Sequence, residues 1–104
     1  MMRALRSMAI VVPALFAAGL AISQGIEWET LNQEVMDLYR AGRYDRAVVV
    51  AKKALEVAER SVGQDHPNVA TSLNNLARLY RKTKRNKEAE LLEAEAARIR
   101  TIER

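Results

Sequence analysis

Apolar residues recur with a helical period along most of the chain. Trp28, Leu31, Val35 and Leu38 are separated by three, four and three residues, which places them on one face of a helix. No segment alternates apolar and polar residues over the length of a strand between turn residues, so we expect no β-sheet. The pattern predicts an all-α fold with helices at about 27–41, 45–62, 67–82 and 86–102.

The breaks between these stretches carry residues that end and begin helices. Gly42 and Gly63 suit the position just past a helix end, where the backbone often takes a positive φ. Pro67 fits the first turn of a helix because its missing N–H is not needed there. His66 precedes this proline, and a residue in that position avoids helical φ and ψ angles. We therefore expect His66 to cap the helix that follows.

One pattern of apolar and small residues occurs twice, 42 residues apart, first from Leu31 to Ala54 and then from Leu73 to Ala96. Each copy predicts a hairpin of two helices, and one hairpin cannot bury its own apolar stripe. We therefore expect two stacked hairpins in a short α-solenoid, with repeat one at about 28–62 and repeat two at about 67–102. Trp28 is expected to cover the open edge of the first hairpin.

The N-terminal residues have the features of an export signal. Two arginines precede an uncharged run from Met8 to Ile22, and the run ends in small residues of the kind that a signal peptidase accepts. We predict that 1–23 is a signal peptide cleaved after Ser23 and that 24–104 is the repeat domain. The protein would then be periplasmic or secreted, in a bacterium.

A retained membrane anchor at 8–22 is the alternative for this segment. The run is about 15 residues long and contains Pro13 and Gly19, whereas a membrane span needs roughly 18 apolar residues. Contact with a membrane is expected only if this segment is retained.

The composition argues against catalytic and metal chemistry. The chain has no cysteine and one histidine, His66, so it lacks thiolate nucleophiles, disulfides and a cluster of metal ligands. Its carboxylates fall on solvent-facing helix positions with no pocket to separate their pKa values. We predict no enzyme activity, no cofactor and no metal site.

The charge balance is mild. Without 1–23 the chain keeps 15 basic and 13 acidic residues, a net charge of +2. No aromatic residues are interleaved with the basic run near residues 78–87 as a stacking platform. Nucleic-acid binding is therefore not expected.

The second hairpin carries a family resemblance. Residues 65–80, DHPNVATSLNNLARLY, followed by KEAE at 87–90, resemble tetratricopeptide repeats of the kinesin light chain type. The first hairpin looks like the same repeat at Leu38 to Ala47 and at Ala54-Leu55. Repeats of this type have a longer second helix and connector, which agrees with the 42-residue period. The resemblance implies an α-solenoid that binds proteins or peptides.

Three residues depart from the pattern of these repeats. Lys84 stands in place of the turn glycine, at a cost of about 1 kcal/mol if the backbone there needs a positive φ. Asn86 replaces the turn tyrosine and is expected to recover part of that cost as an N-cap. Glu93 occupies a usually apolar site, which indicates a helix face without a third repeat against it. The final helix could act as a polar cap on a monomer, or two copies could associate as a homodimer through the exposed end.

The resemblance also implies a peptide groove on the concave face made by the first helix of each hairpin. Carried onto this chain, the groove residues are Asn32, Gln33, Met36, Arg40, Thr71, Asn74, Asn75, Arg78, Arg81 and Lys82. Asn75 matches an asparagine whose amide commonly bonds the backbone of a ligand, since an amide offers both donors and an acceptor.

Six cations and no acid lie between Arg78 and Lys87. Arg78, Arg81 and Lys82 would bias the groove toward acidic peptides or a C-terminal carboxylate, because guanidinium and carboxylate groups pair through two hydrogen bonds. The alternative is a solvated helix end, where cations are favoured by the helix dipole.

Overall fold

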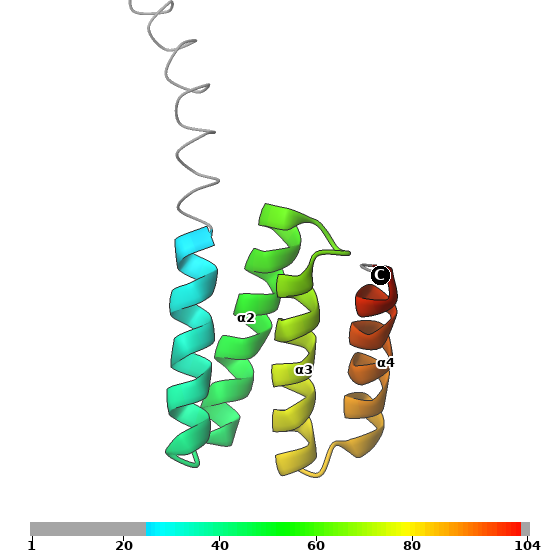
Figure 1. The fold of residues 1–104 in the computed structure, drawn as a ribbon. Helices are drawn as coiled ribbons and strands as arrows, with labels where there is room; N and C mark the ends of the chain where they lie inside the picture. Colours follow the sequence, from blue (N-terminus) through cyan, green and yellow to red (C-terminus); the bar gives the residue numbers. More distant parts are fainter. Residues whose placement is uncertain (1–24, 103–104) are drawn as a thin grey trace, which may run out of the picture.

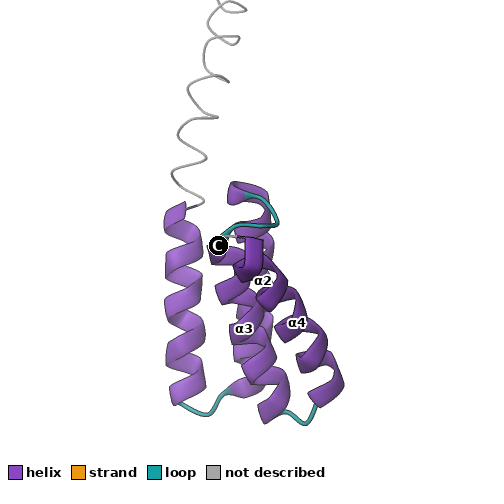
Figure 2. Cartoon of the chain, turned by 45° about the vertical axis from the view of Figure 1, so that its right-hand side comes forward, coloured by secondary structure: helices purple, strands orange, loops and turns teal. Residues whose placement is uncertain are grey.

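The computed structural model describes residues 25–102 of the chain, and within this range it contains four helices and no strand (Figure 2). The helices are 25–40, α2 (Tyr44–Val62), α3 (Pro67–Lys82) and α4 (Asn86–Ile102). They run up and down in chain order, and α3 packs against both α2 and α4 (Figure 1). The predicted all-α fold of stacked hairpins is confirmed, and the helix ends that lie inside the described range are within one residue of their predicted positions. The predicted signal peptide or anchor lies outside the described residues.

The turns form as the sequence predicts. Gly42 and Gly63 have φ angles of 74° and 87°. His66 has extended backbone angles, and its Nδ1 accepts a hydrogen bond from the backbone N–H of Asn68 at 3.0 Å. Pro67 is the first residue of α3. The predicted histidine cap is therefore confirmed, and it satisfies one of the free N–H groups at the start of α3.

The turn of the second hairpin repeats the turn of the first. Lys84 has a φ of 64°, close to that of Gly42. The N–H of Arg85 donates to the carbonyl of Tyr80 at 2.7 Å, and the N–H of Arg43 donates to that of Leu38 at 2.9 Å. A lysine thus holds a backbone conformation that favours glycine, at the position where the sequence predicted the cost.

The predicted role of Asn86 as an N-cap is wrong. Asn86 is itself the first residue of α4. The carbonyl of Arg85 accepts the first helical hydrogen bond, from the N–H of Ala89 at 3.0 Å, as the carbonyl of Arg43 does from Ala47. The turn keeps the geometry of the first hairpin, and this geometry places residue 86 one position inside the helix.

Two clusters of buried residues form the core. One lies at the end of the bundle that holds the two hairpin turns and draws on all four helices, including Val35, Ala51, Leu79 and Ala89. The other joins α2, α3 and α4 at the opposite end. The small residues predicted to allow close helix approach, Ala47, Ala51, Ala54 and Ala58, are at most 2% exposed.

Two side-chain hydrogen bonds cross the seam between the hairpins. The indole N–H of Trp28 donates to the hydroxyl of Ser72 at 2.7 Å, and the amide N–H of Asn75 donates to the amide oxygen of Asn32 at 2.7 Å. Ser72 is only 2% exposed, so its hydroxyl needs this partner. Trp28 is half-buried and packs on the second core cluster, so it lies at the seam between the hairpins.

The second hairpin differs from the first on the face of its second helix, the face that would meet a following repeat. Val48, Ala51 and Ala58 of α2 are buried in clusters that include residues of α3. A shift of one 42-residue repeat maps these three positions onto Glu90, Glu93 and Arg100 of α4. The corresponding face of α4 is thus charged and offers no apolar stripe to a further helix.

Candidate functional site

A cleft of about 550 Å³ lies over α3 and α4. α3 contributes Thr71, Asn74, Asn75, Arg78 and Arg81, five residues that share one face of this helix. α4 contributes Glu93 and Arg100. Three guanidinium groups therefore line the cleft against one carboxylate.

Arg81 and Glu93 face each other across the cleft. Arg81 Nε donates to one carboxylate oxygen of Glu93 at 2.9 Å, and Nη2 donates to the other at 2.5 Å. Both side chains remain about two-fifths exposed. The hydrogen bonds lower the pKa of Glu93, and the bond and charge of Glu93 raise the pKa of Arg81. The pair has the two-bond geometry by which arginine recognises a carboxylate.

Arg78 is held at the seam between the hairpins. Its guanidinium carbon lies 5.7 Å from the ring centre of Tyr39 on helix 25–40. Lys82 approaches the same ring and that of Tyr44, at 5.9 and 6.0 Å. Among residues 25–102 neither cation forms an ion pair within 4.0 Å. The rings orient these cations without neutralising them.

Asn75, the predicted ligand-binding amide, is half-buried and already bonded to Asn32 through one N–H. Within the described chain its other amide hydrogen and its carbonyl oxygen make no hydrogen bond, so donor and acceptor capacity remains. Asn32 serves to orient the amide of Asn75 and lies at the seam.

No predicted residue of helix 25–40 lines the cleft, although Asn32 is bonded to Asn75, which does. Gln33 lines a shallow depression with Glu29, Thr30, Glu34 and Asp37. Its amide donates to Asp37 at 3.0 Å, and Arg40 pairs with the same carboxylate at 3.5 Å. This depression is acidic.

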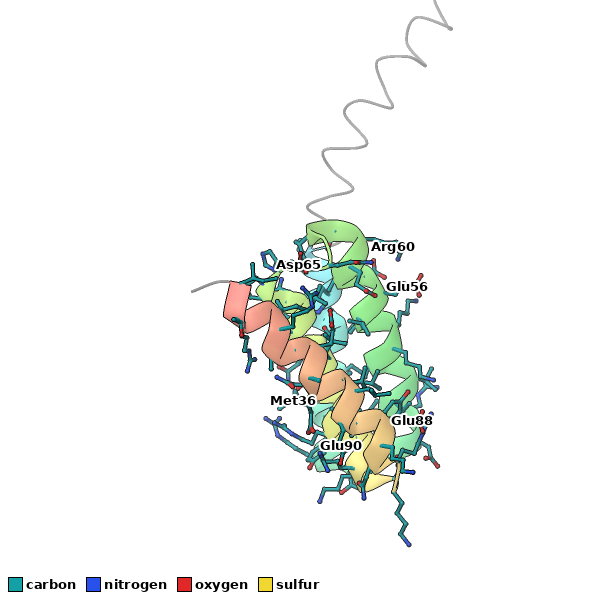
Figure 3. All side chains as sticks on the ribbon, turned by 90° about the vertical axis from the view of Figure 1, so that its right-hand side faces the viewer. Met36, Glu56, Arg60, Asp65, Glu88 and Glu90 are labelled. Carbon is teal, nitrogen blue, oxygen red and sulfur yellow. The ribbon has the colours of Figure 1, made fainter. Side chains whose placement is uncertain are left out.

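Met36 is half-buried. Figure 3 places it on the same side of the molecule as Glu90, while Glu56, Arg60 and Glu88 project from the opposite side.

Half of the ten predicted groove residues meet in one cleft. The predicted residues of helix 25–40 and Lys82 do not line it.

The sequence prediction missed Glu93 and Arg100 as cleft residues. Both belong to the second helix of a hairpin, whereas the resemblance directed attention to the first helices. The 42-residue shift was the available signal, because it equates them with Ala51 and Ala58, two residues that face the next hairpin.

Two other kinds of site are absent from residues 25–102. In this range no group of three or more His, Cys, Asp or Glu residues is placed to hold a metal ion. None of the described helices has the length and apolarity that a membrane crossing requires.

Comparison with known proteins shows one family match and several similar proteins. The tetratricopeptide repeat family matches residues 29–102. The chain is similar to nephrocystin-3 of Xenopus laevis, Homo sapiens and Mus musculus, with 41%, 42% and 39% identity over 69 residues. These alignments cover 66% of this chain but 5% of each relative, so the chain spans a small part of the length of the relatives that it matches.

Proposed function

The chain belongs to the tetratricopeptide repeat family, and on this premise we propose that it binds a segment of another protein noncovalently, in the cleft over α3 and α4. Tetratricopeptide repeats generally mediate protein–protein interactions, and the family is typically non-enzymatic. The observation that carries the proposal is the cleft itself, where the Asn75 amide and three arginines converge on one exposed face.

The chemistry of the cleft favours an acidic ligand. Arg78 keeps its charge without a carboxylate partner among residues 25–102, and Asn75 retains hydrogen-bonding capacity suited to a peptide backbone. An extended peptide with Asp or Glu side chains, or a chain terminus, would supply both contacts. We also propose that these repeats are of the kinesin light chain type, because residues 65–80 resemble repeats of that type.

A matched pair of charge reversals tests the site. A labelled hexaglutamate peptide serves as the probe, with hexaglutamine as its uncharged counterpart, and fluorescence polarisation reports binding. Arg78→Glu should weaken hexaglutamate binding at least about tenfold, since it replaces a pairing group by a repelling one. Lys53→Glu makes the same change of charge at an exposed residue of α2. Lys53 lies one and two helical turns from Glu56 and Arg60, which project from the side opposite Met36 and Glu90 (Figure 3).

Lys53→Glu should change hexaglutamate affinity less than about threefold, because screening weakens a charge far from the site. Equal losses in the two variants would show attraction to net charge alone and would refute the site. Binding of hexaglutamine as tight as that of hexaglutamate would refute the preference for acidic ligands.

We further propose that the protein is exported, with 1–23 removed and the repeats acting in the periplasm or outside the cell. The support is the basic start, the apolar run and the small residues before position 24. Intact mass of the protein from a cell envelope fraction tests this, because a retained anchor at 8–22 would leave the full-length mass.

A monomer is proposed for the mature chain rather than a homodimer. The support is the charged face of α4, where Glu90, Glu93 and Arg100 stand in the places of buried α2 residues. Two copies stacked through this face would desolvate these charges. Light scattering should give one chain's mass, and a concentration-dependent dimer would contradict the proposal.

A further inference from the structure

Among residues 25–102, Glu93 is the one carboxylate that lines the cleft over α3 and α4. It stands where the first repeat has Ala51, a residue 2% exposed in the core. A small apolar residue in the first hairpin is thus replaced in the second by an acid that reaches over to α3. The replacement puts a carboxylate among the groups proposed to recognise carboxylates.

The contacts of Glu93 are those that a bound ligand would make. Its two oxygens accept from Nε and Nη2 of Arg81 at 2.9 and 2.5 Å, which uses the side-on edge of the guanidinium. Asn74 and Arg100 line the same cleft beside it. The pair is about two-fifths exposed, so solvent and a ligand can both reach it.

We propose that Glu93 is an internal ligand of the cleft, which occupies Arg81 in the free protein and is displaced when a carboxylate of the bound peptide takes its place. The inference rests on the proposed function of the cleft. Glu93 then sets the selectivity of the site, because only a ligand with a well-placed carboxylate can replace the two hydrogen bonds that are lost. A neutral peptide cannot replace these two hydrogen bonds, so Arg81 stays paired with Glu93.

Two neighbouring acids provide matched controls. Glu90 interacts with Arg81 only through its charge. Glu88 makes the same two-bond contact with an arginine, Arg85, at 2.9 and 2.6 Å. Glu88 lies five residues before Glu93, about 140° around the helix, and projects to the other side of α4 (Figure 3).

The experiment measures hexaglutamate affinity for the wild type, Glu93→Gln, Glu90→Gln and Glu88→Gln at low ionic strength. We expect Glu93→Gln to tighten binding about fivefold, the scale of an exposed ion pair that no longer has to be broken. Glu90→Gln should give about twofold or less, because it removes a charge but frees no donor. Glu88→Gln should leave the affinity unchanged. Circular dichroism of each variant checks that α4 remains helical.

A second arm tests the route through Arg81. In an Arg81→Gln background, addition of Glu93→Gln should give no more than the gain of Glu90→Gln, because no guanidinium remains to be freed. In the wild type, the Arg81 Nε–H signal in a ¹⁵N NMR spectrum should shift on addition of hexaglutamate but not of hexaglutamine.

Several results would overturn the inference. A gain in Glu93→Gln equal to that in Glu90→Gln would mean that the substitution only reduces the electrostatic repulsion of the probe. Weaker binding in Glu93→Gln would mean that the Arg81–Glu93 ion pair is needed to hold the binding site in shape. If the wild type binds hexaglutamate through Arg78 and Glu93→Gln has no effect, the inference fails while the proposed function stands. If neither protein binds the probe, both fail.

Discussion

Replacement of Lys84 by glycine should stabilise the protein. The backbone of Lys84 has a φ of 64°, and its side chain is exposed and forms no ion pair among residues 25–102. A left-handed conformation costs an L-residue about 1–2 kcal/mol. Glycine escapes this cost but loses about 0.5–1 kcal/mol more backbone entropy on folding. From the middle of the two ranges, Lys84→Gly should gain about 0.75 kcal/mol in the free energy of unfolding.

Gly42→Ala is the reciprocal control. A Cβ at Gly42 would meet no atom within 4 Å, so the substitution adds backbone strain without a steric clash and reduces the backbone entropy lost on folding. With a φ of 74° it should destabilise the first hairpin by about 1 kcal/mol.

Thermal unfolding followed by circular dichroism measures both effects. For a domain of this size 1 kcal/mol corresponds to about 4–8 °C in the unfolding midpoint, so Lys84→Gly should raise the midpoint by about 3–6 °C and Gly42→Ala should lower it. An unchanged or lower midpoint for Lys84→Gly, with Gly42→Ala lowering it, would show that the two turns are not equivalent in energy.

Three further predictions concern the core, the seam and the surface acids. Leu79 has no exposed surface, so Leu79→Ala should lower the free energy of unfolding in urea by about 2–5 kcal/mol. Leu91 is 73% exposed, so Leu91→Ala should change it by no more than about 0.5 kcal/mol. Similar costs for the two variants would refute the assignment of the core. Trp28→Phe should lower the free energy of unfolding by about 1–3 kcal/mol because it leaves the buried Ser72 hydroxyl without its donor. Adding Ser72→Ala should recover part of this loss in a double-mutant cycle. Strict additivity of the two substitutions would contradict the role of the hydrogen bond. Arginine contacts lower the pKa values of Glu88, Glu93 and Glu95 below the ordinary 4.5, so their stabilising effect is complete above that pH and is lost as pH falls through the lowered values. The variant with glutamine at all three positions should therefore show a shallower acid decline of the unfolding midpoint, and an identical decline would refute the role of these pairs.

The fold could be predicted from the sequence because its local and tertiary requirements agree. The helix ends near residues 42, 63 and 67 carry glycine or proline at positions where the backbone needs them. The apolar period and the 42-residue shift then fix which faces pack. The expected N-cap at Asn86 is wrong because the turn geometry of the repeat, and not the capping preference of asparagine, decides where α4 begins.

The candidate site could be predicted only in part. Residues on one face of α3 come together because a single helix fixes their spacing, so Thr71, Asn74 and Arg78 line one cleft as expected. The partners of Arg81 and Asn75 could not be predicted from spacing within a helix. Glu93 and Asn32 reach them from other helices, at distances set by packing.

Binding of a ligand over α3 and α4 is tested by a map of NMR shifts during titration with hexaglutamate. Backbone signals of Thr71, Asn74 and Arg78, with the side-chain amide of Asn75, should move together and saturate at one ligand per chain. Shifts confined to Lys52 and Lys53 on α2, or spread evenly over the exposed lysines without saturation, would contradict it.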